Sequence, residues 1–150
     1  MLYFAYGSNL NRAHFCALCP AATAIGKAKL FGYRLVFKTF ADIEPCLEGK
    51  VEGALWRVTA PCETALDRYE EIASGLYERR IVEVLGDADG RTVEAFTYRM
   101  TRQAWAAPST TYLKLIEDGY RDFGLDMAAL RFAMGRDQET PGQYATRPDA

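Results

Sequence analysis

The fold is decided by residues 76–100, which read LYERRIVEVLGDADGRTVEAFTYRM. Two runs rich in β-branched and aromatic residues, 76–85 and 91–100, lie on either side of Asp87-Ala88-Asp89-Gly90. An Asp-Gly pair tolerates the positive φ angles that a tight chain reversal needs. The stretch therefore predicts two neighbouring strands joined as a hairpin.

A helix is expected before this hairpin and another after it. The first should end near Ile72, and its start is marked by a cap, an early proline and a first-turn acid, namely Thr59, Pro61 and Glu63. The second begins after Ser109 and closes at Gly124, because serine caps helix starts and glycine ends helices. A last short helix is expected over residues 127–134.

The N-terminal part of the chain is expected to add more strands. Residues 2–6 form a short strand, residues 23–40 carry two strand-like runs broken near Phe31-Gly32, and residues 51–58 form another strand. The intervening residues 41–50 contain a proline and a glycine and are expected to be a loop. Because consecutive strands mix with isolated helices, we expect an α+β fold with an antiparallel or mixed sheet that could close as a small barrel.

The length and composition are those of one compact domain. The chain has 150 residues, of which 49% are hydrophobic and 25% charged, so a single domain over residues 1–150 is expected, with a polar tail from about residue 135. The net charge of -2, without a long run of one sign, argues against a nucleic-acid partner. No stretch approaches the ~20 apolar residues of a membrane span, and the first residues lack a leader pattern. A cytoplasmic protein without membrane contact is expected, and the oligomeric state stays open.

The four cysteines are a first possibility for chemistry. Cys16 and Cys19 have the spacing of a redox or metal half-site, whereas Cys46 and Cys62 have no Cys or His at ligand spacing. Reduced structural thiols are the favoured interpretation, and a metal or disulfide site is the alternative. Because His14 is the single histidine, Ser-His or Cys-His catalysis would depend on it alone. No metal or cofactor is therefore expected.

A second possibility is the loop Tyr6-Gly7-Ser8-Asn9-Leu10, where the first strand ends and a helix begins at once. We expect Asn9 or Asn11 to cap this helix and Pro20 to end it. Glycine lets the backbone approach a ligand, and N–H groups at a helix start favour an anion. The loop is therefore a candidate anion cradle. A simple capped turn explains the same residues, and the signatures of nucleotide loops are absent from the sequence.

The helix that should end near Ile72 carries two adjacent glutamates with different expected environments. Glu70 lies one turn after Leu66, at the margin of the apolar stripe, whereas Glu71 lies one turn after Asp67 on the polar side. Burial raises the pKa of a carboxyl group toward neutrality, which suits a general base. Glu70 is therefore the candidate acid–base group, with an ordinary solvated helix end as the alternative.

Three tyrosines complete the set of candidates. Tyr77 opens one strand of the hairpin, Tyr98 lies near the end of the other, and Tyr112 is in the first turn of the helix capped by Ser109. Since Tyr98 and Tyr112 flank residues 101–108, their hydroxyls could meet at the same end of the sheet. Core packing explains these tyrosines too, but a buried hydroxyl needs a partner and a ligand carboxylate would serve.

Taken in order, four segments resemble the γ-glutamylcyclotransferase-like family, which includes the AIG2-like proteins. Residues 6–10 resemble its substrate loop, and residues 66–77, LDRYEEIASGLY, resemble its catalytic segment, usually Leu-Asp-x-x-Glu-Gly-Val-x-x-Gly-x-Tyr. Residues 96–98 and 108–112 match its later tyrosine positions. The resemblance runs from residue 2 to about residue 126.

The resemblance implies a small closed β-barrel, surrounded by helices, that binds a glutamyl group in a cavity at one barrel end. It implies a cofactor-free enzyme that cyclises the γ-glutamyl group of a small-molecule substrate to 5-oxoproline and releases an amine or amino acid. It assigns the catalytic role to Glu70, in agreement with the helical geometry. The implied substrate contacts are Tyr6, Gly7, Ser8, Asn9, Leu10, Tyr77, Tyr98 and Tyr112. The sequence departs from the family at Glu71, where glycine is usual.

Two alternatives stay open. The chain could be a non-catalytic member of the fold that binds a small metabolite or a protein, or a cyclotransferase acting on a γ-glutamylamine or a γ-glutamyl-protected biosynthetic intermediate. Glutathione ranks lower as a substrate, because glutathione-specific relatives usually show Gly-Ser-Leu where this chain has Gly7-Ser8-Asn9. The leaving group is therefore not determined by the sequence.

Overall fold

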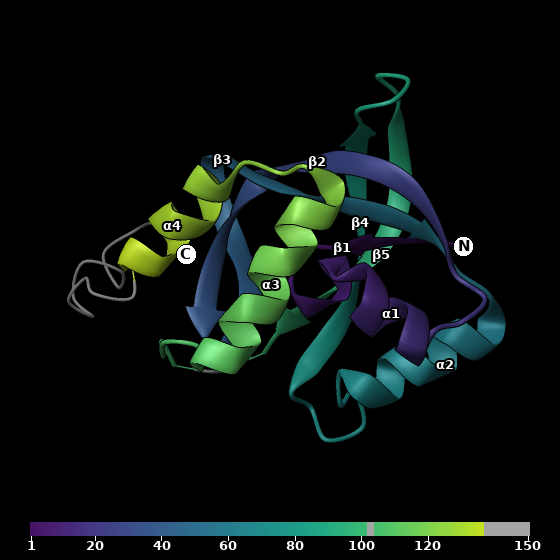
Figure 1. Ribbon diagram of the computed structural model, residues 1–150, viewed down its shortest axis with the longest axis horizontal. Helices are drawn as coiled ribbons and strands as arrows, with labels where there is room; N and C mark the ends of the chain where they lie inside the picture. The colour runs from purple at the N-terminus through teal and green to yellow at the C-terminus, as the bar shows by residue number, and fades with distance from the viewer. Residues whose placement is uncertain (102–103, 137–150) are drawn as a thin grey trace.

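The fold is a closed five-stranded barrel in the computed structural model, which describes residues 1–101 and 104–136 (Figure 1). The strand order around the barrel is β1-β3-β2-β4-β5, and β1 pairs with β5 in parallel while the other neighbours are antiparallel. The elements follow one another as β1 (Leu2–Ala5), a 3-10 helix η1 (Ser8–Leu10), α1 (Arg12–Leu18), β2 (Thr23–Lys38), β3 (Phe40–Arg57), α2 (Ala60–Tyr69), β4 (Tyr77–Gly86), β5 (Thr92–Met100), α3 (Thr110–Phe123) and α4 (Met127–Arg136). The predicted mixed barrel with surrounding helices is confirmed.

The β4–β5 hairpin has the predicted form. Its strands pair without a register shift from Tyr77 opposite Met100 to Leu85 opposite Thr92. The turn closes with a hydrogen bond from the Gly86 amide to the Arg91 carbonyl, and Gly90 has the positive φ of 65° that its position requires. Figure 1 shows the tip of this hairpin projecting away from the helices.

The prediction of a loop at residues 41–50 is wrong, because these residues belong to β3. This strand pairs along the whole of β2, and the pairing shifts between Phe31 opposite Lys50 and Tyr33 opposite Pro45. The shift leaves residues 46–49 opposite Gly32 alone, so the chain bulges outward there. The proline and glycine that suggested a loop therefore mark a bulge inside a long strand.

One helix boundary differs from the prediction and another decides between two predicted caps, and both matter for the site. Helix α2 ends at Tyr69, short of Ile72, so Glu70 caps the helix instead of lying within it. Near the N-terminus, Asn11 caps α1 and its side chain accepts from the His14 amide at 3.0 Å. Asn9 is thus left free of a capping role and turns toward the cavity described below.

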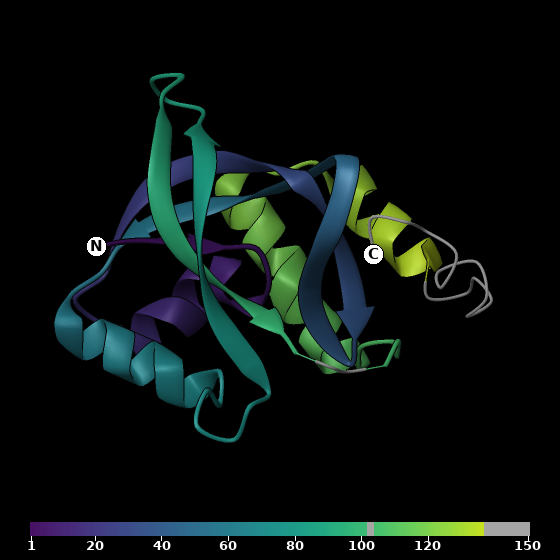
Figure 2. The same cartoon turned by 180° about the vertical axis from the view of Figure 1, so that it is seen from behind.

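Helix α3 holds the first loop in place. Gly119 faces this loop so closely that a Cβ there would lie 2.7 Å from the Asn11 amide nitrogen and from Leu10. The Asn11 side-chain amide donates to the Leu115 carbonyl at 3.2 Å, which adds a direct bond between loop and helix. Figures 1 and 2 show α1 and α3 together on one side of the barrel. No helix in the described part of the chain is both long and apolar enough to cross a membrane.

The cysteines are free thiols, and they occupy different environments. Cys16 is exposed, whereas Cys19 and Cys62 are buried, with the Cys19 thiol donating to the Cys62 carbonyl at 3.7 Å. Burial beside Cys62 raises the pKa of the Cys19 thiol to about 12, so this thiol stays protonated. Over residues 1–101 and 104–136, no cluster of three or more His, Cys, Asp or Glu side chains is placed to hold a metal ion.

Candidate active site

A cavity of about 200 Å³ lies where η1, the end of α2, the start of β3 and α3 come together. It collects every predicted site residue except Leu10, which is fully buried in the core. The lining is formed by Tyr3, Tyr6, Gly7, Ser8, Asn9, Phe40, Ala41, Tyr69, Glu70, Glu71, Leu76, Tyr77, Tyr98 and Tyr112. Residues as distant in the chain as Tyr3 and Tyr112 thus share one small space.

The first wall of the cavity is the loop that follows β1. A Cβ on Gly7 would lie 3.1 Å from the Ala41 Cβ and 3.4 Å from the Tyr112 hydroxyl, so a larger residue would intrude on the opposite wall. The amides of Leu10 and Asn11 donate to the carbonyls of Gly7 and Ser8. Within the described residues, the amides of Gly7, Ser8 and Asn9 have no acceptor. Three backbone donors are therefore available to a ligand.

The acid–base candidate, Glu70, faces this loop from the end of α2. Its side chain is partly buried, and burial raises the pKa of the carboxyl from 4.5 to about 8. The Asn9 side-chain amide approaches the Glu70 carboxyl at 3.5 Å and also donates to the Tyr3 hydroxyl at 2.9 Å. A carboxyl with this pKa can accept and return a proton near neutral pH.

The opposite wall is built around the backbone of Ala41. The Tyr77 hydroxyl donates to the Ala41 carbonyl at 2.7 Å, and the Ala41 amide donates to the Tyr112 hydroxyl at 3.1 Å. The Tyr98 hydroxyl instead donates to the Asp67 carboxylate at 2.6 Å. Four of these five residues line the cavity, and Asp67 does not. Tyr98 and Tyr112 thus share one cavity, and the hydroxyls of Tyr77 and Tyr112 both contact the backbone of Ala41.

Burial keeps these tyrosines in their neutral form. Desolvation raises the pKa of Tyr77, Tyr98 and Tyr112 well above the ordinary value, and the nearby charges of Glu70 and Asp67 add to the rise. Their hydroxyls therefore act as hydrogen-bond donors and acceptors and not as proton acceptors for chemistry. The carboxyl of Glu70, by contrast, has its pKa moved toward neutral pH by burial.

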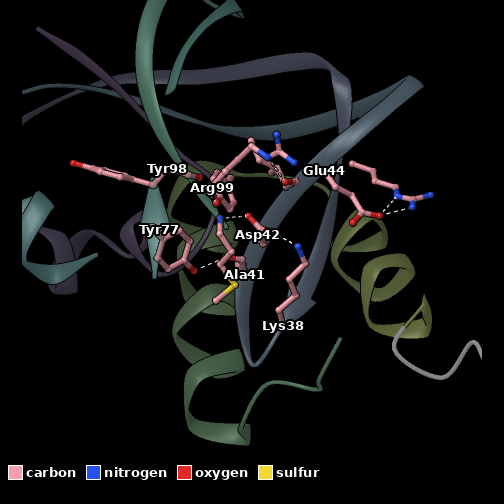
Figure 3. A network of polar contacts seen from close by, with 11 residues as sticks. Lys38, Ala41, Asp42, Glu44, Tyr77, Tyr98 and Arg99 are labelled. Carbon is pink, nitrogen blue, oxygen red and sulfur yellow. Dashed lines mark hydrogen bonds and ion pairs between the residues drawn. The ribbon is translucent and has the colours of Figure 1, made fainter. Parts of the chain in front are cut away.

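Ala41 lies in the tip of the β2–β3 hairpin, residues 37–42, which an ion pair holds in place. Lys38 and Asp42 form an ion pair of 2.7 Å, and Figure 3 shows both side chains pointing toward each other beside Ala41 and Tyr77. Asp42 is fully buried and also accepts from the Met100 amide at 2.8 Å. Burial raises the pKa of Asp42, while the Lys38 ammonium opposes that rise. This pair fixes the tip against β5.

Several lining residues were missed by sequence reasoning. Tyr3 lies in β1, where Tyr3, Phe4 and Ala5 are all buried, so no alternation along the strand distinguishes it. Tyr69 precedes Glu70, and its hydroxyl contacts the Ser8 hydroxyl at 3.2 Å. Ala41 was hidden by the mistaken loop prediction, and Phe40 was placed at the end of a predicted strand-like stretch; only the pairing of β2 with β3 brings both to the cavity.

The fold and the cavity together define a class, namely a small mixed barrel whose cavity holds a carboxyl group of raised pKa beside a loop with free backbone donors. The family model described as gamma-glutamyl cyclotransferase, AIG2-like, matches residues 3–120. The chain belongs to this family.

Individual relatives agree with the family match. The chain is similar to proteins named gamma-glutamylcyclotransferase from Mus musculus, with 31% identity over 83% of this chain and 72% of the relative, and from Homo sapiens, with 31% identity over 84% and 73%. A solved structure named gamma-glutamyl cyclotransferase superposes with a TM-score of 0.80 at 28% identity, covering 98% of this chain and 92% of that one. The likeness therefore extends over nearly the whole fold.

The departure from the family pattern at Glu71 has a structural counterpart. Glu71 has a φ of 53°, in the left-handed region where glycine is favoured. A glycine would adopt this conformation without the crowding that a Cβ introduces. The chain thus keeps a carboxylate, in a backbone position that suits glycine, on the lining of the cavity.

Proposed function

We propose that this chain is a γ-glutamylcyclotransferase that cyclises a γ-glutamyl compound to 5-oxoproline and releases the attached amine or amino acid. The observation that carries the proposal is the position of Glu70, whose carboxyl has a pKa of about 8 and which lines the same small cavity as a loop with three free backbone amides. Family membership and the names of the mouse and human relatives support the reaction class.

Substrate binding would use the loop at Gly7, Ser8 and Asn9. Its unpaired amides can donate to the α-carboxylate of the glutamyl group, or to the oxyanion that develops on the γ-carbonyl. Gly7 keeps the loop narrow enough for a ligand to approach the backbone. Holding the α-amino group against the γ-carbonyl also makes ring closure favourable, since correct positioning can contribute roughly 7–11 kcal/mol in well-oriented systems.

The proton transfers would run through Glu70. The ionised carboxylate removes one proton from the α-ammonium group of the substrate, and the resulting amine attacks the γ-carbonyl carbon to form the new C–N bond. The protonated Glu70 then donates that proton to the departing nitrogen as the old C–N bond breaks. As the intermediate collapses, the ring nitrogen loses its remaining extra proton to the released amine, so the products are 5-oxoproline and an ammonium ion, and Glu70 returns to its ionised form with no water consumed.

The test is to incubate the protein with a panel of γ-glutamyl amino acids and γ-glutamylamines and to measure 5-oxoproline. We expect turnover of at least one member and a loss of 10²-fold or more in kcat for Glu70→Gln, as for other general acid–base groups. Full activity of Glu70→Gln with loss in Glu71→Gln would move the catalytic role by one residue. Binding without turnover across the whole panel would favour the non-catalytic alternative.

A further inference from the structure

The cavity has a closed bottom and an open rim. Tyr3, Asn9 and Tyr98 are at most 4% exposed and close the bottom, next to the free amides of the loop. Phe40 is 40% exposed and Tyr69 39% exposed, and both belong to the rim. If the glutamyl group binds the loop amides as proposed above, the leaving group must point outward between these rim residues.

Glu71 is an exposed part of that rim. Its backbone is fixed on both sides, since its amide donates to the Arg68 carbonyl at 3.2 Å and its carbonyl accepts from the Leu76 amide at 3.3 Å. Its carboxylate forms no ion pair with any residue of the described ranges 1–101 and 104–136. The charge is therefore held at the mouth of the cavity without a partner from this part of the chain.

We propose that Glu71 determines specificity by selecting leaving groups that carry a positive charge away from the scissile nitrogen. This inference rests on the proposed function. A distal ammonium would meet the Glu71 carboxylate and the exposed rings of Tyr69 and Phe40, which attract cations through their faces. A leaving group with a carboxylate, such as an amino acid released through its α-amino group, would place like charges together. The favoured substrates are thus γ-glutamyl derivatives of diamines.

The test compares three substrates that differ at the end of the leaving group. They are the mono-γ-glutamyl derivatives of 1,4-diaminobutane, butylamine and 4-aminobutyrate, which end in an ammonium, a methyl group and a carboxylate. We expect kcat/KM to fall in that order, by on the order of tenfold at each step in low salt, because charges a few ångströms apart interact on this scale near a protein surface. Raising the salt concentration should shrink both ratios.

Two variants connect the preference to the residue. Glu71→Gln should bring the three kcat/KM values close together, and Glu71→Lys should reverse their order. Glu48→Gln removes the same charge from an exposed site in the β3 bulge, outside the cavity lining, and should leave the ratios unchanged. Thermal unfolding of each variant checks that the fold is intact.

The outcomes separate this inference from the proposed function. Turnover of all three substrates at equal kcat/KM, or a preference that survives in Glu71→Gln, would overturn the inference and leave the proposed function standing. Failure of every γ-glutamyl substrate to release 5-oxoproline would overturn the proposed function, and the inference with it.

Discussion

The two long hairpins of the barrel reverse direction in different ways. The β4–β5 hairpin turns over residues 87–90, with a glycine at the positive φ angle, and its tip lies away from the cavity. The β2–β3 hairpin turns at Thr39, a β-branched residue with a φ of 69°, and its neighbours Phe40 and Ala41 line the cavity. The first turn is favoured by its own residues, whereas the second is imposed by the structure around it. Unfavourable local conformations thus gather at the cavity, as Glu71 also illustrates.

The largest effect is expected from the ion pair that holds the β2–β3 tip. Asp42→Ala would leave the largely buried Lys38 without its partner and the Met100 amide without its acceptor. The free energy of unfolding should fall by about 3–5 kcal/mol, as for other broken buried pairs. Chemical denaturation measures the change. As a control in the β4–β5 hairpin, Asp89→Ala removes an exposed hydrogen bond to the Arg91 amide. If this substitution lowered the free energy of unfolding as much as Asp42→Ala does, the difference between the two hairpins would be refuted.

The next substitution, Glu70→Gln, should raise the free energy of unfolding. Because the folded-state pKa of Glu70 is about 8 and its ordinary value is 4.5, the folded state is favoured below pH 4.5 and this advantage is lost as the pH rises toward 8. Glu70→Gln should therefore be more stable than the original chain by up to about 3 kcal/mol at pH 7, and by little at pH 4. Unfolding curves across this pH range measure the difference, and a pH-independent difference would argue against the raised pKa.

A smaller effect is expected in the turn that lies away from the cavity. Gly90→Ala places a Cβ at a φ of 65° and should destabilise the protein by about 1–2 kcal/mol. The kcat/KM for the preferred γ-glutamyl substrate should stay the same once folding is complete. A fall in kcat/KM without loss of folded protein would show that this hairpin also shapes the site.

The smallest effect on stability is expected at Thr39, in the turn of the β2–β3 hairpin. Thr39→Gly relieves the positive φ angle but also makes the unfolded chain more flexible, so the gain in stability should stay below about 1 kcal/mol. Activity should fall, because Phe40 and Ala41 lose the restraint that positions them. Equal activity with higher stability would mean that the Thr39 conformation has no role in the site.

The same contrast explains which parts of the molecule could be predicted from sequence. The β4–β5 hairpin, the Ser109 cap and the Gly124 end of α3 depend on neighbouring residues, and each was predicted correctly. The start of β3 depends on pairing with a distant partner and on a bulge, so local turn residues gave the wrong prediction.

The site shows the same division between local and distant information. Glu70 could be chosen because burial follows helical spacing, and the structure agrees that it is the more buried of the two glutamates. The bond between Tyr77 and Ala41, by contrast, joins residues that only the closed barrel brings together. The catalytic role of Glu70, the substrate contacts of the individual residues, the cytoplasmic location and the cofactor-free chemistry stay predictions.

The close contact at Gly119 has a consequence for the motions of the protein. Because α3 packs closely against Leu10 and Asn11 and its Leu115 carbonyl accepts from the Asn11 side chain, opening the loop breaks contacts with the helix. Loop and helix should therefore open together as one cooperative unit, and the hydrogen-bonded amide protons of Leu10 and Asn11 should exchange with solvent at the rate of those in α3. The loop after β1 should, in that sense, be as stable as α3.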